Sequence, residues 1–306
     1  MSIASARLAK PARPRPRLLE TWRQFAKHKG AVVGLAVFLL IVLTVVFGPL
    51  VHTVDPQFSN LLERNQGPSL GHPFGTDNLG RDMLAQTLAG GRISLAVGLS
   101  AMALSILLGS VIGLLSGYFS WLDGLLMRLT DLFLALPLLP LLLVVIMLFR
   151  DPLRRAFGSP ETGIFILIVA AIALTSWMQT ARVVRGEVLA VREKEFVTAA
   201  NALGSNGNRV IFLHILPNVL SPILVSATLG VANAIITESA LSFLGLGFPP
   251  DFPTWGRLLF DGANFLSINP TRVLWPGLAI SLTVLSVNFI GDGLRDAFDP
   301  QLRGRS

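Results

Sequence analysis

Six long apolar runs constrain the fold of this chain more than any other feature of its sequence. The first run, 31–51, contains no charged residue, and a helix needs about 20 mostly apolar residues to cross the hydrocarbon core of a bilayer. The other runs lie at 93–119, 125–149, 163–181, 219–240 and 273–290. We therefore predict an all-α membrane protein with six transmembrane helices.

The composition agrees with this class. Hydrophobic residues make up 52% of the chain and charged residues 14%, whereas soluble domains carry about 25% charged residues. The chain has no cysteine, which excludes disulfides, thiol catalysis and Cys-ligated zinc. Its four histidines are scattered and form no HExxH-like pair, so we expect no metal site.

The distribution of Lys and Arg predicts the orientation. With the N-terminus inside, 17 of the 25 basic residues lie in inside segments and 8 in outside segments. Because cytoplasmic loops are enriched in Lys and Arg, this bias favours cytoplasmic N- and C-termini. The outer loop with Arg150, Arg154 and Arg155 runs against the rule. The basic residues form no patch with aromatic readers, so nucleic acid is not an expected partner.

These patterns divide the chain into five parts. The N-terminal part is a basic arm followed by a short interfacial helix, in which Leu18, Trp22 and Phe25 fall at helical spacing. The first apolar run is too long for a cleaved signal peptide and acts as an uncleaved anchor. The expected parts are 1–30 (cytoplasmic arm and interfacial helix), 31–51 (first transmembrane helix), 52–92 (periplasmic segment), 93–293 (five-helix core) and 294–306 (cytoplasmic tail).

The cytoplasmic loop 182–217 is unusually long and mostly helix-forming. We predict one helix from Arg182 to Leu203 that stops at Gly204, and a second helical piece that leads into Pro217. A membrane protein that receives force from a soluble partner needs such a projecting element. An ordinary connector capped by Gly204 fits these residues equally well.

A motif with long spacing lies within this loop. It reads Thr198-Ala199-Ala200, three residues, Gly204, nine residues, and then His214-Ile215-Leu216-Pro217. It resembles the EAA loop of binding-protein-dependent ABC importer permeases, with Thr198 in place of the usual Glu and His214 in place of the usual Ile. Roughly residues 18 to 302 resemble the dipeptide, oligopeptide and nickel branch of that family, through blocks at 29–34, 74–82, 92–95, 127–131, 291–296 and 299–300.

The resemblance implies a type I ABC importer permease fold with both termini inside, located in the bacterial inner (plasma) membrane. It implies four kinds of partner: a homologous second permease chain, one or two ABC ATPase subunits, a periplasmic or lipid-anchored substrate-binding protein, and the lipid bilayer. The chain would be no enzyme and would bind no cofactor, since ATP and Mg belong to the ATPase subunits. The residues implied in ATPase coupling are Glu195, Phe196, Thr198, Ala199, Ala200, Leu203, Gly204, Leu216 and Pro217.

The fifth apolar run contains the candidate pathway residues Asn233, Thr237 and Glu238. Asn233 and Thr237 line a polar pathway or bond between helices. Glu238 is an intramembrane carboxylate and therefore a functional candidate; alternatively it reaches water or a partner's Arg.

Three further features carry expectations. Asp131 follows Arg128 by three residues, which predicts an ion pair on one helix face. The block 75–82 reads as a turn-rich brace for the second membrane helix. Trp255, in an outer loop, packs on the binding protein or serves as an interfacial anchor.

Two other function classes compete with a transport subunit. A stand-alone secondary transporter or channel predicts polar residues near the midplane of several helices and often an internal repeat, and neither is evident. An intramembrane enzyme needs clustered His, Asp or Ser partners within the spans, and these are missing. Small peptides are the preferred substrate; nickel, glutathione and opine-like importers share the same motifs.

Overall fold

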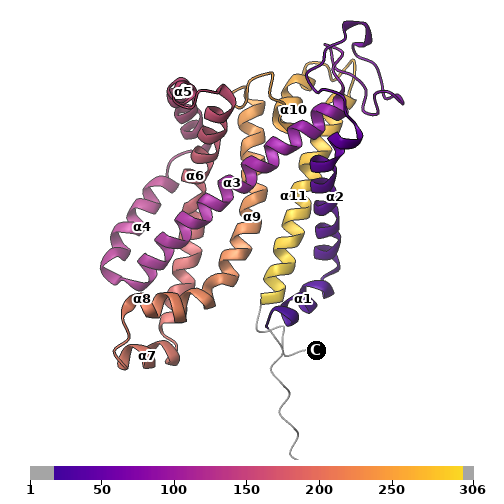
Figure 1. The fold of residues 1–306 in the computed structure, drawn as a ribbon. Coiled ribbons are helices and arrows are strands. Elements are labelled where there is room, and N and C mark those ends of the chain that lie inside the picture. The colour runs from indigo at the N-terminus through magenta and orange to yellow at the C-terminus, as the bar shows by residue number, and fades with distance from the viewer. Residues whose placement is uncertain (1–16, 299–306) are drawn as a thin grey trace, which may run out of the picture.

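The computed structural model describes residues 17–298, apart from the side chains of 17–20 and 160. Every regular element in this part is a helix, and the backbone has one isolated bridge, between Thr76 and Asp82. This confirms the predicted all-α class. The elements are α1 Arg17–Lys27, α2 Lys29–Val51, η1 Leu61–Glu63, α3 Met83–Tyr118, α4 Ser120–Leu134, α5 Leu138–Ala156, α6 Pro160–Arg192, α7 Glu195–Ala202, α8 Gly207–Val210, the π-helix η2 Ile211–Ile215, α9 Leu216–Phe243, α10 Trp255–Ala263 and α11 Thr271–Phe298 (Figure 1).

Five of the six predicted spans fall within helices long and apolar enough to cross a membrane: α2, α3, α6, the run 207–243 that includes α9, and α11. The remaining span, 125–149, consists of two helices, because α4 and α5 meet at an angle of 87°. Pro137 is the extended N-cap of α5, and a proline disfavours helical backbone in the residue before it. Taken together, the two helices are long and apolar enough to cross a membrane.

The contact between α3 and α6 is the most extensive between any two of the described helices. Gly109 and Gly113 lie on the face of α3 that meets α6, where an added Cβ would come within 2.6 Å of the Trp177 carbonyl oxygen and 2.7 Å of the Ala181 carbonyl oxygen, respectively. Small residues allow membrane helices to approach closely and gain van der Waals contact. This glycine ridge fixes how α6 crosses α3.

Both described ends of the chain lie at the same end of the bundle (Figure 1). Phe25 of α1 is buried against Ala297 near the end of α11, and His28 lies 3.7 Å from the Asp296 carboxylate. The helix α7 projects from this end too, whereas α10 lies at the opposite end. An even number of spans predicts this arrangement.

The segment before α3 braces the opposite, outer end. Asp82 caps α3 by accepting a 2.6 Å hydrogen bond from the Ala85 amide, and its carboxylate also contacts His52 Nε2 at 3.0 Å and His72 Nδ1 at 2.7 Å. Asp77 accepts bonds from the amide and the guanidinium of Arg81. The predicted brace is confirmed, and α3 starts ten residues before the predicted span.

Candidate functional site

A cavity of about 440 Å³ lies between α3, α6, α9 and the first residue of α5. Its lining combines polar and apolar residues and carries no charge. The polar residues come from two helices, α6 and α9. The α6 wall consists of Thr175, Ser176, Gln179 and Thr180, the α9 wall of Ser226, Asn233 and Thr237, and the rest of Met102, Leu138, Val183, Leu229, Gly230 and Ile236.

The structure places two of the three candidate pathway residues in this cavity. Asn233 is exposed, and Thr237 lies one turn further along α9, with its hydroxyl bonded to the Asn233 carbonyl at 2.8 Å. The α6 wall was not predicted from the sequence. Its signal was present, because Thr175 and Gln179 are polar residues four apart in an apolar span, and such residues share one helix face.

Glu238 does not line the cavity, and the expectation that it reaches water or a partner's Arg is wrong. Its exposed fraction is 0%. Its carboxylate accepts hydrogen bonds from the hydroxyls of Ser94 at 2.9 Å and Ser242 at 2.7 Å. The Ser94 hydroxyl in turn accepts the Trp255 amide at 3.2 Å. Glu238 thus ties α9 to α3 and to the first residue of α10.

Trp255 is part of the interior and not an outer contact residue. Its exposed fraction is 1%, and its indole N–H donates to the Thr87 carbonyl at 3.0 Å. Buried tryptophans usually find such a partner for the N–H group. Both outer-surface roles considered for Trp255 are therefore wrong.

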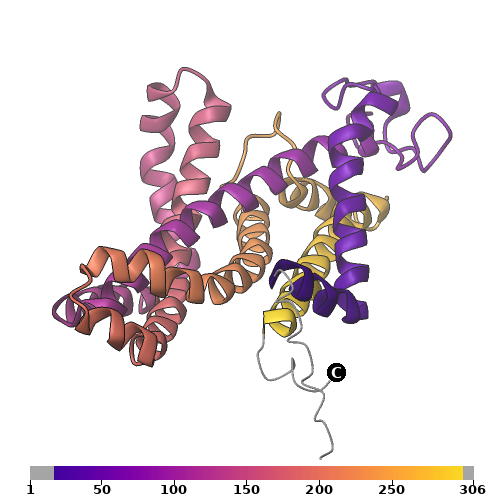
Figure 2. The same cartoon turned by 60° about the horizontal axis from the view of Figure 1, so that its bottom comes forward.

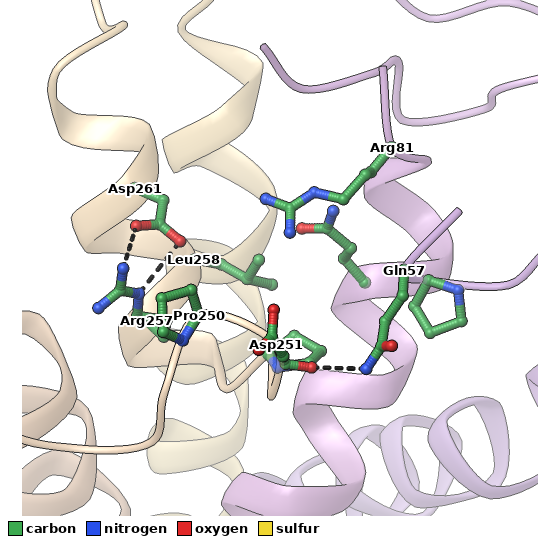
Figure 3. Close-up of a pocket in the computed structure, with 10 residues that line it drawn as sticks. Gln57, Arg81, Pro250, Asp251, Arg257, Leu258 and Asp261 are labelled. Atoms are coloured by element: carbon green, nitrogen blue, oxygen red, sulfur yellow. Dashed lines mark hydrogen bonds and ion pairs between the residues drawn. The ribbon is translucent and has the colours of Figure 1, made fainter. Parts of the chain in front are cut away.

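A small hollow at the outer end joins α10 to the segment before α3 (Figure 3). Arg257 pairs with Asp261 at 3.0 Å, and the Gln57 side chain donates to the Asp251 carbonyl at 2.7 Å. The hollow measures about 10 Å³, which holds at most about one water molecule. The ion pair and the hydrogen bond around it brace the outer end, and the hollow itself has no room for a ligand. Residues 17–298 contain no group of three or more His, Asp or Glu placed to hold a metal ion.

The loop between α6 and α9 forms the second candidate site. The predicted single helix 182–203 is wrong: α6 continues to Arg192, the backbone turns extended at Lys194, and α7 is a separate helix. Gly204 ends α7 as predicted, with φ +76°. The Gly204 amide donates to the Asn201 carbonyl at 2.9 Å, and the Ser205 amide to the Ala200 carbonyl at 3.1 Å. These two bonds form a Schellman motif.

The two faces of α7 have different roles. Val197 and Ala200 are buried in a cluster with apolar residues of α6, α8 and η2. The two alanines of the motif are therefore divided, because Ala200 faces inward while Ala199 faces outward. The outward face and the following turn expose Glu195, Phe196, Thr198, Ala199, Leu203 and Gly204.

The end of the motif explains how the loop returns to the membrane. Pro217 has no N–H group, so the turn before it is closed by the Leu216 amide, which donates to Ile211 five residues back. The Asn218 side chain donates to the His214 carbonyl at 2.7 Å. A π-helical turn therefore carries the chain from α8 into α9, with Leu216 half-buried and Pro217 exposed.

Comparison with known proteins identifies the family. Residues 105–304 match the family described as "binding-protein-dependent transport system inner membrane component". The chain belongs to this family. Residues 17–68 also match the "N-terminal TM domain of oligopeptide transport permease C". The family places the chain in the inner membrane, as predicted.

Curated members of the family align along nearly the whole chain. The dipeptide transport system permease protein DppC of Alkalihalophilus pseudofirmus is 40% identical, with 93% of this chain and 90% of the relative covered. The oligopeptide transport system permease protein OppC of Bacillus subtilis is 39% identical, with 93% and 91% covered.

A solved structure supports the fold. It is an inward-facing conformation of the MetNI methionine ABC transporter, with a TM-score of 0.55 at 16% identity, covering 68% of this chain and 94% of that one. At this identity the likeness establishes the fold alone, and the type I importer permease fold was the one expected.

Proposed function

We propose that this chain is one permease subunit of an ATP-driven, binding-protein-dependent importer of di- or oligopeptides. The observation that carries the proposal is the α7 loop, in which a capped helix projects from the membrane-spanning bundle within the Thr198–Pro217 motif. Phe196 and Leu203 are exposed there, Leu203 at 87%. Both lie in the loop between α6 and α9, where a partner subunit could cover them.

In this proposal, α7 is the contact for one or two ABC ATPase subunits, which bind the ATP and Mg. The buried face of α7, with Val197 and Ala200, transmits displacement of the helix to α6 and α9. Tightly packed helices move as rigid bodies, so a displacement of α7 moves the helices packed against it.

A homologous second permease chain completes the translocation pathway. Gln179 and Asn233 are exposed although they line the cavity, so the cavity opens at the surface of this chain. The uncharged polar lining offers hydrogen bonds to a peptide backbone and selects weakly among side chains. Selection then falls to the periplasmic or lipid-anchored binding protein. The names of the aligned relatives support peptide as the substrate class.

Co-purification tests the docking of an ATPase. The chain is co-expressed with the candidate partner permease and ATPases encoded beside it and extracted in mild detergent. We expect the ATPases to be retained by the unaltered chain and by Ala263→Glu, which changes an exposed alanine at the opposite end. We expect Ala199→Glu to abolish retention. A folded, unaltered chain that retains no ATPase would instead favour a stand-alone transporter.

Uptake of labelled di- and tripeptides into proteoliposomes that hold the whole complex and the binding protein tests the substrate class. We expect uptake that requires ATP and that unlabelled peptides compete away. Uptake of nickel or glutathione that peptides do not compete away would show that the proposed substrate class is wrong. The assignment as a permease subunit would still hold.

A further inference from the structure

Two ion pairs join α4 to α6. The Arg185 guanidinium donates two parallel hydrogen bonds to the Asp123 carboxylate, Nε to Oδ1 at 2.5 Å and Nη2 to Oδ2 at 2.6 Å. One turn up α6, Arg182 Nη2 lies 2.5 Å from Asp131 Oδ1. The predicted pair between Asp131 and Arg128 is thus replaced by a contact between helices. Bidentate arginine–carboxylate pairs fix the geometry of both partners as well as holding them together.

The first pair is the stronger one. The side chains of Arg185 and Asp123 are 32% and 26% exposed, whereas those of Arg182 and Asp131 are 52% and 60% exposed. Ion pairs between solvent-exposed groups contribute little, because water and salt screen them. Arg185–Asp123 therefore carries most of the contact.

Apolar packing holds α4 at the end nearest the bend, where Phe133 and Leu134 pack against Trp177 and its buried neighbours on α6. Thr130 is its only buried residue, while large apolar side chains such as Trp121 and Leu125 are exposed. In a bilayer, no hydrophobic driving force brings exposed apolar groups from the lipid onto a neighbouring helix. Along the part of α4 before Phe133, the polar bonds to α6 are accordingly the main contacts that favour its observed position.

The inner end of α6 is bonded to α3 and packs against the α7 loop. Arg192, the last residue of α6, donates to the Tyr118 carbonyl of α3 at 3.0 Å. Val188 and Val191 of α6 belong to the same buried cluster as Val197 of α7. Displacement of α7 therefore displaces the inner half of α6.

The far end of α4 leads to the cavity. After Leu134 the chain turns by 87° into α5, and Leu138, the first residue of α5, lines the cavity. Beyond the bend, the α5–α6 hairpin stands apart from α2 and α11 (Figure 2). The position of α4 therefore sets where the bend, and with it one wall of the cavity, lies.

We propose that Arg185 and Asp123 are positioning residues that make α4 follow α6 and α7, with Arg182 and Asp131 as a weaker second contact. Movement received at α7 then reaches the cavity wall at Leu138 through α4. This inference rests on the proposed function.

Charge reversal and exchange test the inference in the complete transporter, reconstituted with its partner permease, ATPases and binding protein. The readout is peptide taken up per ATP hydrolysed. We expect Asp123→Arg and Arg185→Asp each to lower this ratio by about fivefold or more, the lower bound of typical coupling between sites, while ATP hydrolysis continues. We expect the double exchange to restore most of the ratio. Glu187→Arg, a reversal at an exposed site on the same helix, controls for charge alone and should leave the ratio unchanged.

Cross-linking provides a second test that does not depend on how well the reversed variants fold. The chain has no native cysteine, so Asp123→Cys with Arg185→Cys accepts a bifunctional thiol reagent about as long as an arginine side chain. If α4 follows α6, the cross-linked transporter regains the ratio that the free dithiol form lacks. Transport blocked by the cross-link, or single reversals with an unchanged ratio, would overturn the inference. Absence of peptide uptake by the unaltered complex would instead reject the proposed function.

Discussion

The hydroxyl of Ser94 donates a 2.9 Å hydrogen bond to the carboxylate of Glu238, 144 residues further along the chain. The bond joins α3 to α9 directly behind the cavity residue Thr237. With Ser242 on the same carboxylate, it holds the outer half of α9 so that Asn233 and Thr237 face the cavity.

Replacing Glu238 by alanine should destabilise the protein. The change leaves the buried hydroxyls of Ser94 and Ser242 without their hydrogen-bond acceptor, and an unsatisfied buried polar group costs about 1–3 kcal/mol. Thermal unfolding of the purified chain in detergent measures this. Thr237→Ala, on the cavity side of the same helix, is the control and should unfold within a degree or two of the unaltered chain. Equal unfolding temperatures for both variants would contradict the bracing role.

Gly204→Pro should uncouple transport without preventing membrane insertion. The φ of +76° at this position is incompatible with the proline ring, and the substitution also removes the N–H that bonds to Asn201; misplaced proline costs about 3 kcal/mol or more. Peptide uptake and the amount of membrane-inserted chain are measured together. Gly186→Ala serves as control, because its added Cβ meets no atom within 4 Å. Normal uptake by Gly204→Pro would refute the proposed role of α7 in transmitting displacement to α6 and α9.

Gly113→Ala should weaken the packing of α3 on α6. Its Cβ would lie 2.7 Å from both the Ala181 carbonyl oxygen and Val184 Cβ, and overpacking costs about 1–3 kcal/mol. Gly124→Ala makes the same chemical change where no atom lies within 4 Å, and should be neutral or slightly stabilising because alanine favours helices. The measurement is the difference between the unfolding temperatures of the two variants. Equal temperatures would contradict the role of the glycines in the close packing of α3 on α6.

Replacing both Gln179 and Asn233 by leucine should slow peptide uptake while leaving stability unchanged. The double change removes two polar groups from the cavity lining, and each hydrogen bond contributes about 0.5–1.5 kcal/mol. Initial uptake rates in proteoliposomes measure the effect. Leu224→Met, an exposed position on α9 outside the cavity, is the control. Unaltered uptake by the double variant would show that this cavity is not part of the translocation pathway.

A reporter fused after Arg155 should report a periplasmic location. The α5–α6 turn lies at the end of the bundle opposite α7 (Figure 1), and Lys and Arg mark the α7 end as cytoplasmic. Paired alkaline phosphatase and green fluorescent protein fusions measure this. A cytoplasmic signal would reverse the orientation.

The sequence by itself determined the local features. Apolar runs identify the spans because bilayer thickness sets their length. Gly204 identifies the end of α7 because only glycine readily takes positive φ. The spacing from Gly204 to Pro217, together with the matching blocks along the rest of the chain, predicted the family that the comparison shows.

Only the tertiary structure decided which residues meet. Arg182 lies beside Asp131, Glu238 beside Ser94, and Trp255 beside Thr87, each across more than one helix of intervening chain. A span that is apolar on all sides has no preferred buried face, so its sequence does not indicate which side meets a neighbour. Helix packing makes that choice, and it placed Asn233 at the cavity and Glu238, five residues later, in the interior.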